Sequence, residues 1–129
     1  MQSDRAFIFP GQGSQSPQMG QELYKNLPAA RAYLEQAEEI VPGLLSACVG
    51  DKSELLAQTE MAQPAIFTVS ALLWLDLPAS FQQGYLAGHS LGEYTALFAA
   101  GVLDFSATLR VVKVRAELMG KTAQKVGGG

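Results

Sequence analysis

The predicted fold depends on one stretch, Tyr85-Leu86-Ala87-Gly88-His89-Ser90-Leu91-Gly92, which joins a short apolar run to a glycine-flanked serine. Residues 85–87 are typical of a buried strand, and residues 91–100 have the pattern of a helix. A G-x-S-x-G sequence between a strand and a helix holds its serine on a sharp turn. The stretch therefore predicts an α/β fold that presents Ser90 at the end of a strand.

A second apolar run extends from Ala6 to Phe9 and is stopped by Pro10-Gly11. Such a short, uninterrupted run is typical of a strand buried on both faces of a parallel sheet. The polar loop of residues 11–17 follows it directly. Because open α/β sheets bind ligands at the carboxyl ends of their strands, this loop is a candidate site by its position.

Helical patterns occupy most of the chain between the two strands. We expect two amphipathic helices within residues 19–41, broken near residues 26–28. A short helical segment is expected at residues 53–57, followed by a polar turn at residues 58–60.

Two further helices complete the predicted architecture. Residues 63–75 are apolar on nearly all sides, which predicts a central, buried helix with Pro64 in its first turn. Asp104 is a suitable N-cap for a last helix that reaches about residue 123. Because strand and helix signals alternate, the predicted fold class is α/β, a parallel sheet flanked by helices.

Composition places the chain among globular proteins, with 129 residues, 48% of them hydrophobic and 16% charged. Residues 1–129 have the length of one ordinary domain, provided that the fold is closed within them, and by the resemblance given below they are the N-terminal part of a larger α/β domain. The net charge of −3, with no cluster of basic residues, argues against a nucleic-acid partner. No apolar stretch is long enough for a signal peptide or a membrane span, so we expect a cytoplasmic protein without a membrane partner. Cys48, between apolar neighbours, is expected to be a packed thiol.

The position predicted for Ser90 suits acyl transfer. Its oxygen would lie at the positive end of a helix, and the backbone N–H of Leu91 would point to where an oxyanion forms. The simpler alternative is that Gly88 and Gly92 permit a tight turn in which Ser90 only caps the helix. We interpret Ser90 as a nucleophile, in a site that contains no metal ion.

His89 is the single histidine of the chain. Adjacent residues on a sharp turn project apart, so its side chain cannot easily reach the Ser90 hydroxyl as a general base. We place His89 with the substrate-binding residues, and the simpler alternative is a histidine packed or hydrogen-bonded behind the turn.

Several blocks of the sequence together resemble the acyltransferase family of fatty acid and polyketide synthesis, in particular the N-terminal portion of malonyl-CoA:acyl carrier protein transacylases. In chain order, these blocks are Phe9-Pro10-Gly11-Gln12-Gly13-Ser14-Gln15, Met19-Gly20, Ala62-Gln63-Pro64-Ala65-Ile66, Gly88-His89-Ser90-Leu91-Gly92-Glu93-Tyr94, and Ala100-Gly101-Val102-Leu103 with Arg115 and Met119. The resemblance implies an α/β-hydrolase-like acyltransferase core that is incomplete here, without the family's ferredoxin-like subdomain.

By this resemblance, Ser90 takes a malonyl or related acyl group from coenzyme A and passes it to the phosphopantetheine thiol of an acyl carrier protein. The coenzyme A thioester is then a substrate, and no bound cofactor is implied. Gln12 matches a glutamine that helps form the oxyanion hole together with Leu91. Gln63 matches a glutamine that lines the pocket, and Arg115 matches the arginine that holds the free carboxylate of a malonyl unit.

Residue patterns alone leave simpler alternatives for these three side chains. Gln12 could be a solvated turn residue, and Gln63 could stand at the start of a helix. Arg115 could lay its stem along an apolar stripe and keep its head in water.

The family's catalytic histidine comes from a segment well downstream of the arginine, and residues 1–129 do not include it. We therefore expect the chain alone to be nearly inactive, with a second chain as one source of the base. Two other functions remain open: a serine hydrolase that removes acyl groups from carrier proteins, and a non-catalytic module that binds a carrier protein.

Overall fold

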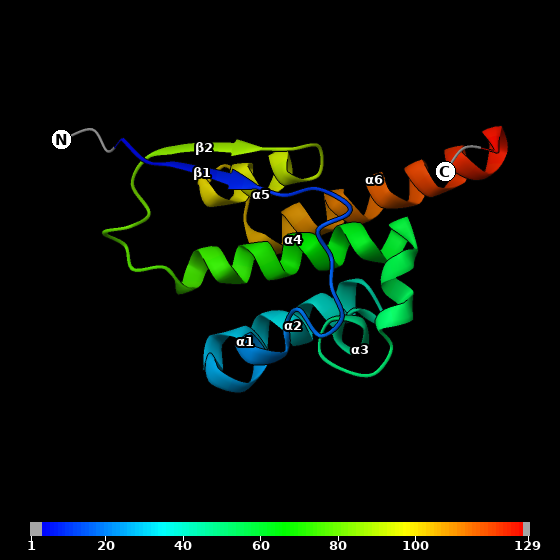
Figure 1. Ribbon diagram of the computed structural model, residues 1–129, viewed down its shortest axis with the longest axis horizontal. Coiled ribbons are helices and arrows are strands. Elements are labelled where there is room, and N and C mark those ends of the chain that lie inside the picture. The colour runs from blue at the N-terminus through cyan, green and yellow to red at the C-terminus, as the bar shows by residue number, and fades with distance from the viewer. Residues whose placement is uncertain (1–3, 128–129) are drawn as a thin grey trace.

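Figure 1 shows a computed structural model of the protein, which describes residues 4–127. Residues 1–3 and 128–129 of the predicted domain lie outside the described residues. The elements follow one another as β1 (Ala6–Phe9), α1 (Gln21–Asn26), α2 (Pro28–Ile40), α3 (Leu44–Cys48), the 3₁₀ helix η1 (Ser53–Ala57), α4 (Thr59–Asp76), β2 (Tyr85–Gly88), α5 (Gly92–Ala99) and α6 (Phe105–Val126).

The two strands form a parallel sheet, as predicted, with Ala6 opposite Tyr85 and Phe9 opposite Gly88. On one face, the Phe7 and Phe9 rings pack edge-on against Trp74 of α4, at centroid distances of 5.1 and 5.9 Å.

The other face of this sheet is open. Ile8 is 74% exposed and Tyr85 is 64% exposed. The prediction that the first strand is buried on both faces is therefore wrong for residues 4–127, because their helices cover one face only.

Helix α4 is the centre of the structure, as its apolar sequence predicts. It lies between the sheet and the group formed by α1, α2 and α3, and α6 packs along it (Figure 1). Residues 62–69 of α4 are all buried. Gly120 of α6 is buried directly against Glu60 of α4, where an added Cβ would overlap the carboxyl group. This close contact fixes how the two helices meet.

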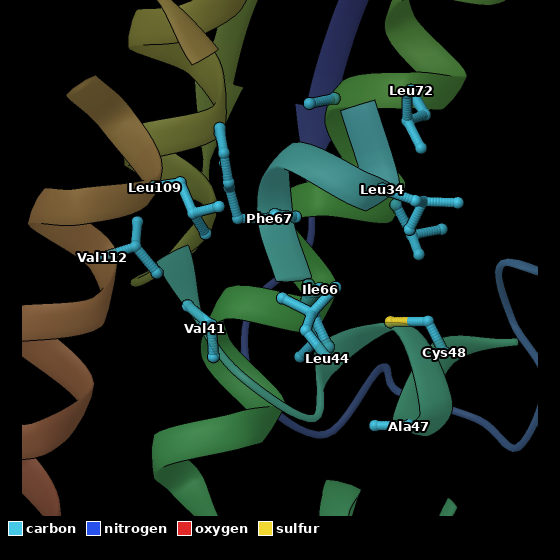
Figure 2. Close-up of a cluster of buried hydrophobic side chains, with 14 of the residues drawn as sticks. Leu34, Val41, Leu44, Ala47, Cys48, Ile66, Phe67, Leu72, Leu109 and Val112 are labelled. Atoms are coloured by element: carbon cyan, nitrogen blue, oxygen red, sulfur yellow. The ribbon is translucent and has the colours of Figure 1, made fainter. Parts of the chain in front are cut away.

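The hydrophobic core is built from α2, α3, α4 and α6 around Phe67. Leu34, Leu44, Ile66, Leu109 and Val112 converge in it, as Figure 2 shows. Cys48 lies in the same core, as expected for a packed thiol. Burial, and to a lesser degree the nearby Glu38 carboxylate, raises the pKa of the Cys48 thiol to about 12.

Helix α4 begins earlier than the sequence predicts. It starts at Thr59, so Pro64 lies inside the helix and not in its first turn, and the predicted turn at residues 58–60 is largely helical. Contacts with other elements hold the additional turn: Glu60 packs against α6, and Thr59 is hydrogen-bonded to Gln63. Helix propensities of single residues carry no information about these tertiary contacts, so the sequence did not predict the earlier start.

The short helix α3 was not predicted. Both carboxylate oxygens of Glu38, on the preceding helix, accept hydrogen bonds at its start, from Gly43 N at 2.9 Å and Leu45 N at 2.8 Å. The capping group therefore lies outside α3 and its N-cap position.

Asp104 begins the last helix as predicted, but that helix extends to Val126, beyond the predicted end near residue 123. Asp104 caps α6, with Oδ1 accepting from Ala107 N at 2.7 Å, and Gly101 follows α5 with φ +76°. Among residues 4–127, no helix combines the length and apolar character needed to cross a bilayer.

Candidate functional site

Ser90 lies on the bend between β2 and α5, and its side chain is exposed. Its φ is +53°, in the left-handed region that a residue with a Cβ rarely adopts. Such a backbone costs on the order of 1–3 kcal/mol and persists only where the surroundings impose it. The bend therefore presents the serine hydroxyl as the sequence predicts.

The two glycines that flank the serine bring three backbone segments into close contact. A Cβ at Gly88 would overlap the backbone of Gly92, and a Cβ at Gly92 would overlap the carbonyl of Phe9. The N–H of His89 also donates to Phe9 O at 3.0 Å. The end of β1 and the bend of β2 are thus locked together, which supplies the surroundings that hold Ser90.

Helix α5 starts directly behind Ser90. The amides of the next residues are used inside the turn: Gly92 N donates to His89 O at 2.9 Å, and Glu93 N donates to Ser90 O at 3.1 Å. The Leu91 amide makes no hydrogen bond to any atom of residues 4–127. A free donor therefore stands next to the serine, at the positive end of a helix.

The loop after β1 borders the serine. Gly11 is buried, and a Cβ on it would lie 3.5 Å from Ser90 Cβ and 2.7 Å from His89 O. The loop is anchored by Gln15, which donates to Leu56 O at 3.2 Å and accepts from Gly13 N at 2.7 Å. Gln15 is therefore a structural anchor of the loop and not a solvated turn residue.

Arg115 of α6 points at the serine. Its Nη2 donates to Ser90 Oγ at 3.0 Å, and its Nη1 donates to Gln63 Oε1. The guanidinium carbon also lies 5.6 Å from the centre of the Tyr94 ring. The alternative of a surface arginine with its head in water is therefore wrong, because the head group is engaged on three sides.

Gln63 and Gln12 join the same group of side chains. Gln63 is fully buried in α4, which rules out a residue at the start of a helix, and its Nε2 donates to Thr59 Oγ1 at 3.0 Å. Thr59 Oγ1 in turn donates to Gln12 Oε1 at 2.7 Å. The structure thus links the three predicted polar side chains to Ser90 by one continuous chain of hydrogen bonds.

His89 behaves differently from its simpler sequence interpretation. The residue is exposed and its side chain makes no hydrogen bond within residues 4–127, so the hydrogen-bonded alternative is wrong, although one edge of the ring lies against Gly11. Its nearest noted neighbour is Gly11, where an added Cβ would lie 3.1 Å from His89 Nδ1. The imidazole thus lies beside the loop that follows β1.

Sequence reasoning missed three members of this site. Thr59 connects the two glutamines, Tyr94 lies beside the Arg115 guanidinium, and Met119 Sδ accepts from Gln63 Nε2 at 3.4 Å. Tyr94 and Met119 stood in the motif blocks but carried no polar pattern of their own. Thr59 is four residues before Gln63, on the same face of a helix, and a correct start for α4 would have revealed it.

The described part of the chain holds no group of three or more His, Cys, Asp or Glu side chains suited to a metal ion. The polar groups linked to Ser90 are its own hydroxyl, nearby backbone amides, two carboxamides and one guanidinium. Such a set can stabilise negative charge on an oxygen and bind a carboxylate.

Known proteins resemble this chain in sequence and in fold. A malonyl CoA-acyl carrier protein transacylase of Synechocystis is 47% identical over 117 residues, which are 88% of this chain and 39% of that protein. The crystal structure of the Synechocystis malonyl-CoA:ACP transacylase matches with a TM-score of 0.80 and 44% identity, over 90% of this chain and 40% of that one.

A further solved structure is a malonyl-transacylase in complex with its type II polyketide synthase acyl-carrier protein. It matches with a TM-score of 0.78 and 35% identity, over 90% of this chain and 38% of that one. The chain therefore spans about two fifths of the length of these proteins. The family model described as the acyl transferase domain matches residues 6–129, almost the whole chain. This protein belongs to the acyl transferase domain family.

Proposed function

We propose that this chain carries the acyl-serine half of a malonyl-CoA:acyl carrier protein transacylase site. The observation that supports this most strongly is the 3.0 Å distance from Arg115 Nη2 to Ser90 Oγ. An acyl group attached to Ser90 would lie against the guanidinium. A carboxylate at the far end of a short acyl chain could then take the paired hydrogen bonds that arginine offers.

The proposed reaction has two steps of the same kind. Ser90 Oγ attacks the thioester carbonyl carbon, its proton passes to a general base, the C–S bond breaks and coenzyme A leaves as the thiol. The thiol of a carrier protein's phosphopantetheine then attacks the serine ester, which returns the proton to Ser90. Each step passes through an oxyanion on the carbonyl oxygen.

The free amide of Leu91 is the first donor proposed for that oxyanion. Gln12 is the second, because its loop is held against the bend through Gly11. That donor is the backbone N–H of Gln12, which, like that of Leu91, makes no backbone hydrogen bond within residues 4–127. Losing one such donor typically costs on the order of a hundredfold in rate.

Gln63 and His89 take supporting parts in this proposal. Gln63 holds one arm of Arg115, so the other arm stays directed at the acyl position. His89 is exposed beside the bend and is proposed to contact the thioester substrate, not to act as the base. The base is proposed to come from polypeptide beyond these residues, or from a second chain.

The partner proposed is an acyl carrier protein. The names of the related enzymes refer to such carriers, and one related malonyl-transacylase has been solved in complex with its carrier protein. No cofactor is proposed, since coenzyme A serves as the carrier of the substrate.

Mass spectrometry of the chain incubated with malonyl-CoA tests the proposal. Imidazole in the buffer serves as the general base. We expect a mass increase of one malonyl group in the wild type, none in Ser90→Ala, and an unchanged increase in the control Ser80→Ala, whose exposed serine lies in the connection before β2. Absence of the adduct with imidazole would contradict the proposal.

The acceptor distinguishes a transferase from a hydrolase. Adding a carrier protein with its phosphopantetheine arm should move the malonyl group to the arm. Release of free malonate at the same rate with and without the carrier would instead indicate a hydrolase. Binding of the carrier without any adduct would indicate a binding module.

A further inference from the structure

The hydrogen bonds around Ser90 form a directed chain, in which Thr59 stands between the two glutamines. The chain runs from Arg115 through Gln63 and Thr59 to Gln12. No residue role given above explains why a threonine stands at this point. The inference rests on the proposed function of Ser90 and concerns how Gln12 is oriented.

The direction is set by Arg115, because a guanidinium can only donate. Its donation to Gln63 fixes the Gln63 carboxamide with Oε1 as acceptor, so Nε2 must donate. That group is directed at Thr59 Oγ1, at 3.0 Å, and Met119 Sδ, at 3.4 Å. Gln63 is fully buried, where an unpaired polar atom is costly, so the opposite orientation is strongly disfavoured.

The hydrogen bonds of Thr59 continue this chain from Gln63 to Gln12. Its hydroxyl oxygen accepts from Gln63, which leaves its one hydrogen to donate to Gln12 Oε1 at 2.7 Å. The Gln12 carboxamide is therefore held by its carbonyl. Its NH₂ group, which has no acceptor within residues 4–127, is left as a donor for a ligand.

Thr59 also ties together two separate elements. Gln15 anchors one end of the loop to Leu56 O, and Thr59 anchors the end that carries Gln12. Since Thr59 is the first residue of α4, the loop takes its position from the same helix that carries Gln63. One helix thus carries Gln63 and also holds the loop that carries Gln12.

We propose that Thr59 is a positioning residue of the acyl-transfer site. By a relay through Gln63 and Thr59, the donor-only Arg115 guanidinium fixes the Gln12 carbonyl as an acceptor, so that the Gln12 NH₂ group stays available to donate to a substrate. Thr59 itself touches no reacting atom. A hydroxyl is needed at this position because it must accept one hydrogen bond and donate another.

Side-chain amide NMR on the full chain tests the relay without any ligand. In Thr59→Val we expect the Gln12 carbonyl carbon to lose its hydrogen-bond shift, and the Gln63 NH₂ protons to exchange roughly three- to tenfold faster. Thr59→Ser keeps a hydroxyl and should restore both signals. Thr68→Val is the matched control, since Thr68 is in the same helix and donates to Pro64 O at 2.8 Å, outside the relay.

The malonyl-CoA and imidazole assay supplies the second measurement. We expect Ser90 acylation to slow roughly tenfold in Thr59→Val and to recover in Thr59→Ser. Unchanged amide signals in the valine variant, or no recovery with serine, would overturn the relay. Changed signals with an unchanged acylation rate would overturn its positioning role. If the wild type forms no adduct, the proposed function fails, and the amide signals alone decide whether the relay exists.

Discussion

The site around Ser90 has two halves that are built in different ways. One half is main chain: the end of β1, the bend of β2 and the start of α5, joined through Gly88, Gly92 and Phe9. The other half is side chains: Arg115, Gln63, Thr59 and Gln12, joined by hydrogen bonds. The first depends on backbones in contact without room for a Cβ, and the second depends on two helices packing in the correct register. The halves should therefore respond differently to substitution.

The largest effect is expected in the main-chain half, from Gly92→Ala. The new Cβ would overlap the Phe9 carbonyl, and backbone cannot move aside as a flexible side chain can. We expect the free energy of unfolding to fall by at least about 3 kcal/mol, measured by urea denaturation.

Gly101→Ala is the matched control for this substitution. Gly101 has a left-handed φ of +76° but open space around it, so only the backbone cost of about 1 kcal/mol is expected. Equal losses in the two variants would show that the contact between the strands does not constrain the bend.

A smaller effect is expected in the side-chain half, from Arg115→Met. The substitution keeps most of the apolar stem but leaves the buried Gln63 carbonyl without its donor. We expect a loss of about 1–3 kcal/mol in the free energy of unfolding. Arg110→Met, on an exposed position of the same helix, should change stability by less than about 0.5 kcal/mol. A loss for Arg110→Met as large as for Arg115→Met would contradict this explanation.

The same division explains what the sequence could and could not predict. The bend was predictable because its requirements are local: a strand, two glycines around Ser90, and a helix start, all within a few residues. The link between Gln12, Gln63 and Arg115 was expected only through family resemblance, because it needs α4 and α6 to be packed first. Thr59 was missed for the same reason, since the start of α4 is fixed by tertiary contacts.

The open face of the sheet marks a further limit of local patterns. The uninterrupted apolar run from Ala6 to Phe9 predicts a strand that is buried on both faces. In residues 4–127, however, Ile8 remains exposed, because whether a face is covered depends on the other elements present. The pattern correctly predicted the strand and the parallel pairing, but not the environment of its second face.

A reversal of the usual order between alanine and glycine is expected at position 90. Glycine normally destabilises an element relative to alanine, but at φ +53° only glycine avoids the left-handed cost. Both substitutions remove the hydroxyl that accepts from Arg115, so that loss cancels between them. We expect Ser90→Gly to be more stable than Ser90→Ala by about 1 kcal/mol in urea denaturation. Equal stabilities of Ser90→Ala and Ser90→Gly would mean that the bend leaves its left-handed φ when the serine is replaced.

The smallest effect is expected in the alkylation rate of Cys48, which distinguishes local from global opening of the structure. The Cys48 thiol is buried in the core on α3, which carries no residue of either half, and burial raises its pKa to about 12. The reactive thiolate is therefore scarce in the folded protein at pH 8, and labelling requires the core to open. In Arg115→Met we expect the rate of Cys48 alkylation to stay within about twofold of the wild type under native conditions, provided that the lost hydrogen bonds loosen only the side-chain half. In Gly92→Ala the rate should rise with the fraction of unfolded chains, since the strands, α5 and the core pack as one unit. A comparable rise in both variants would mean that the two halves do not open independently.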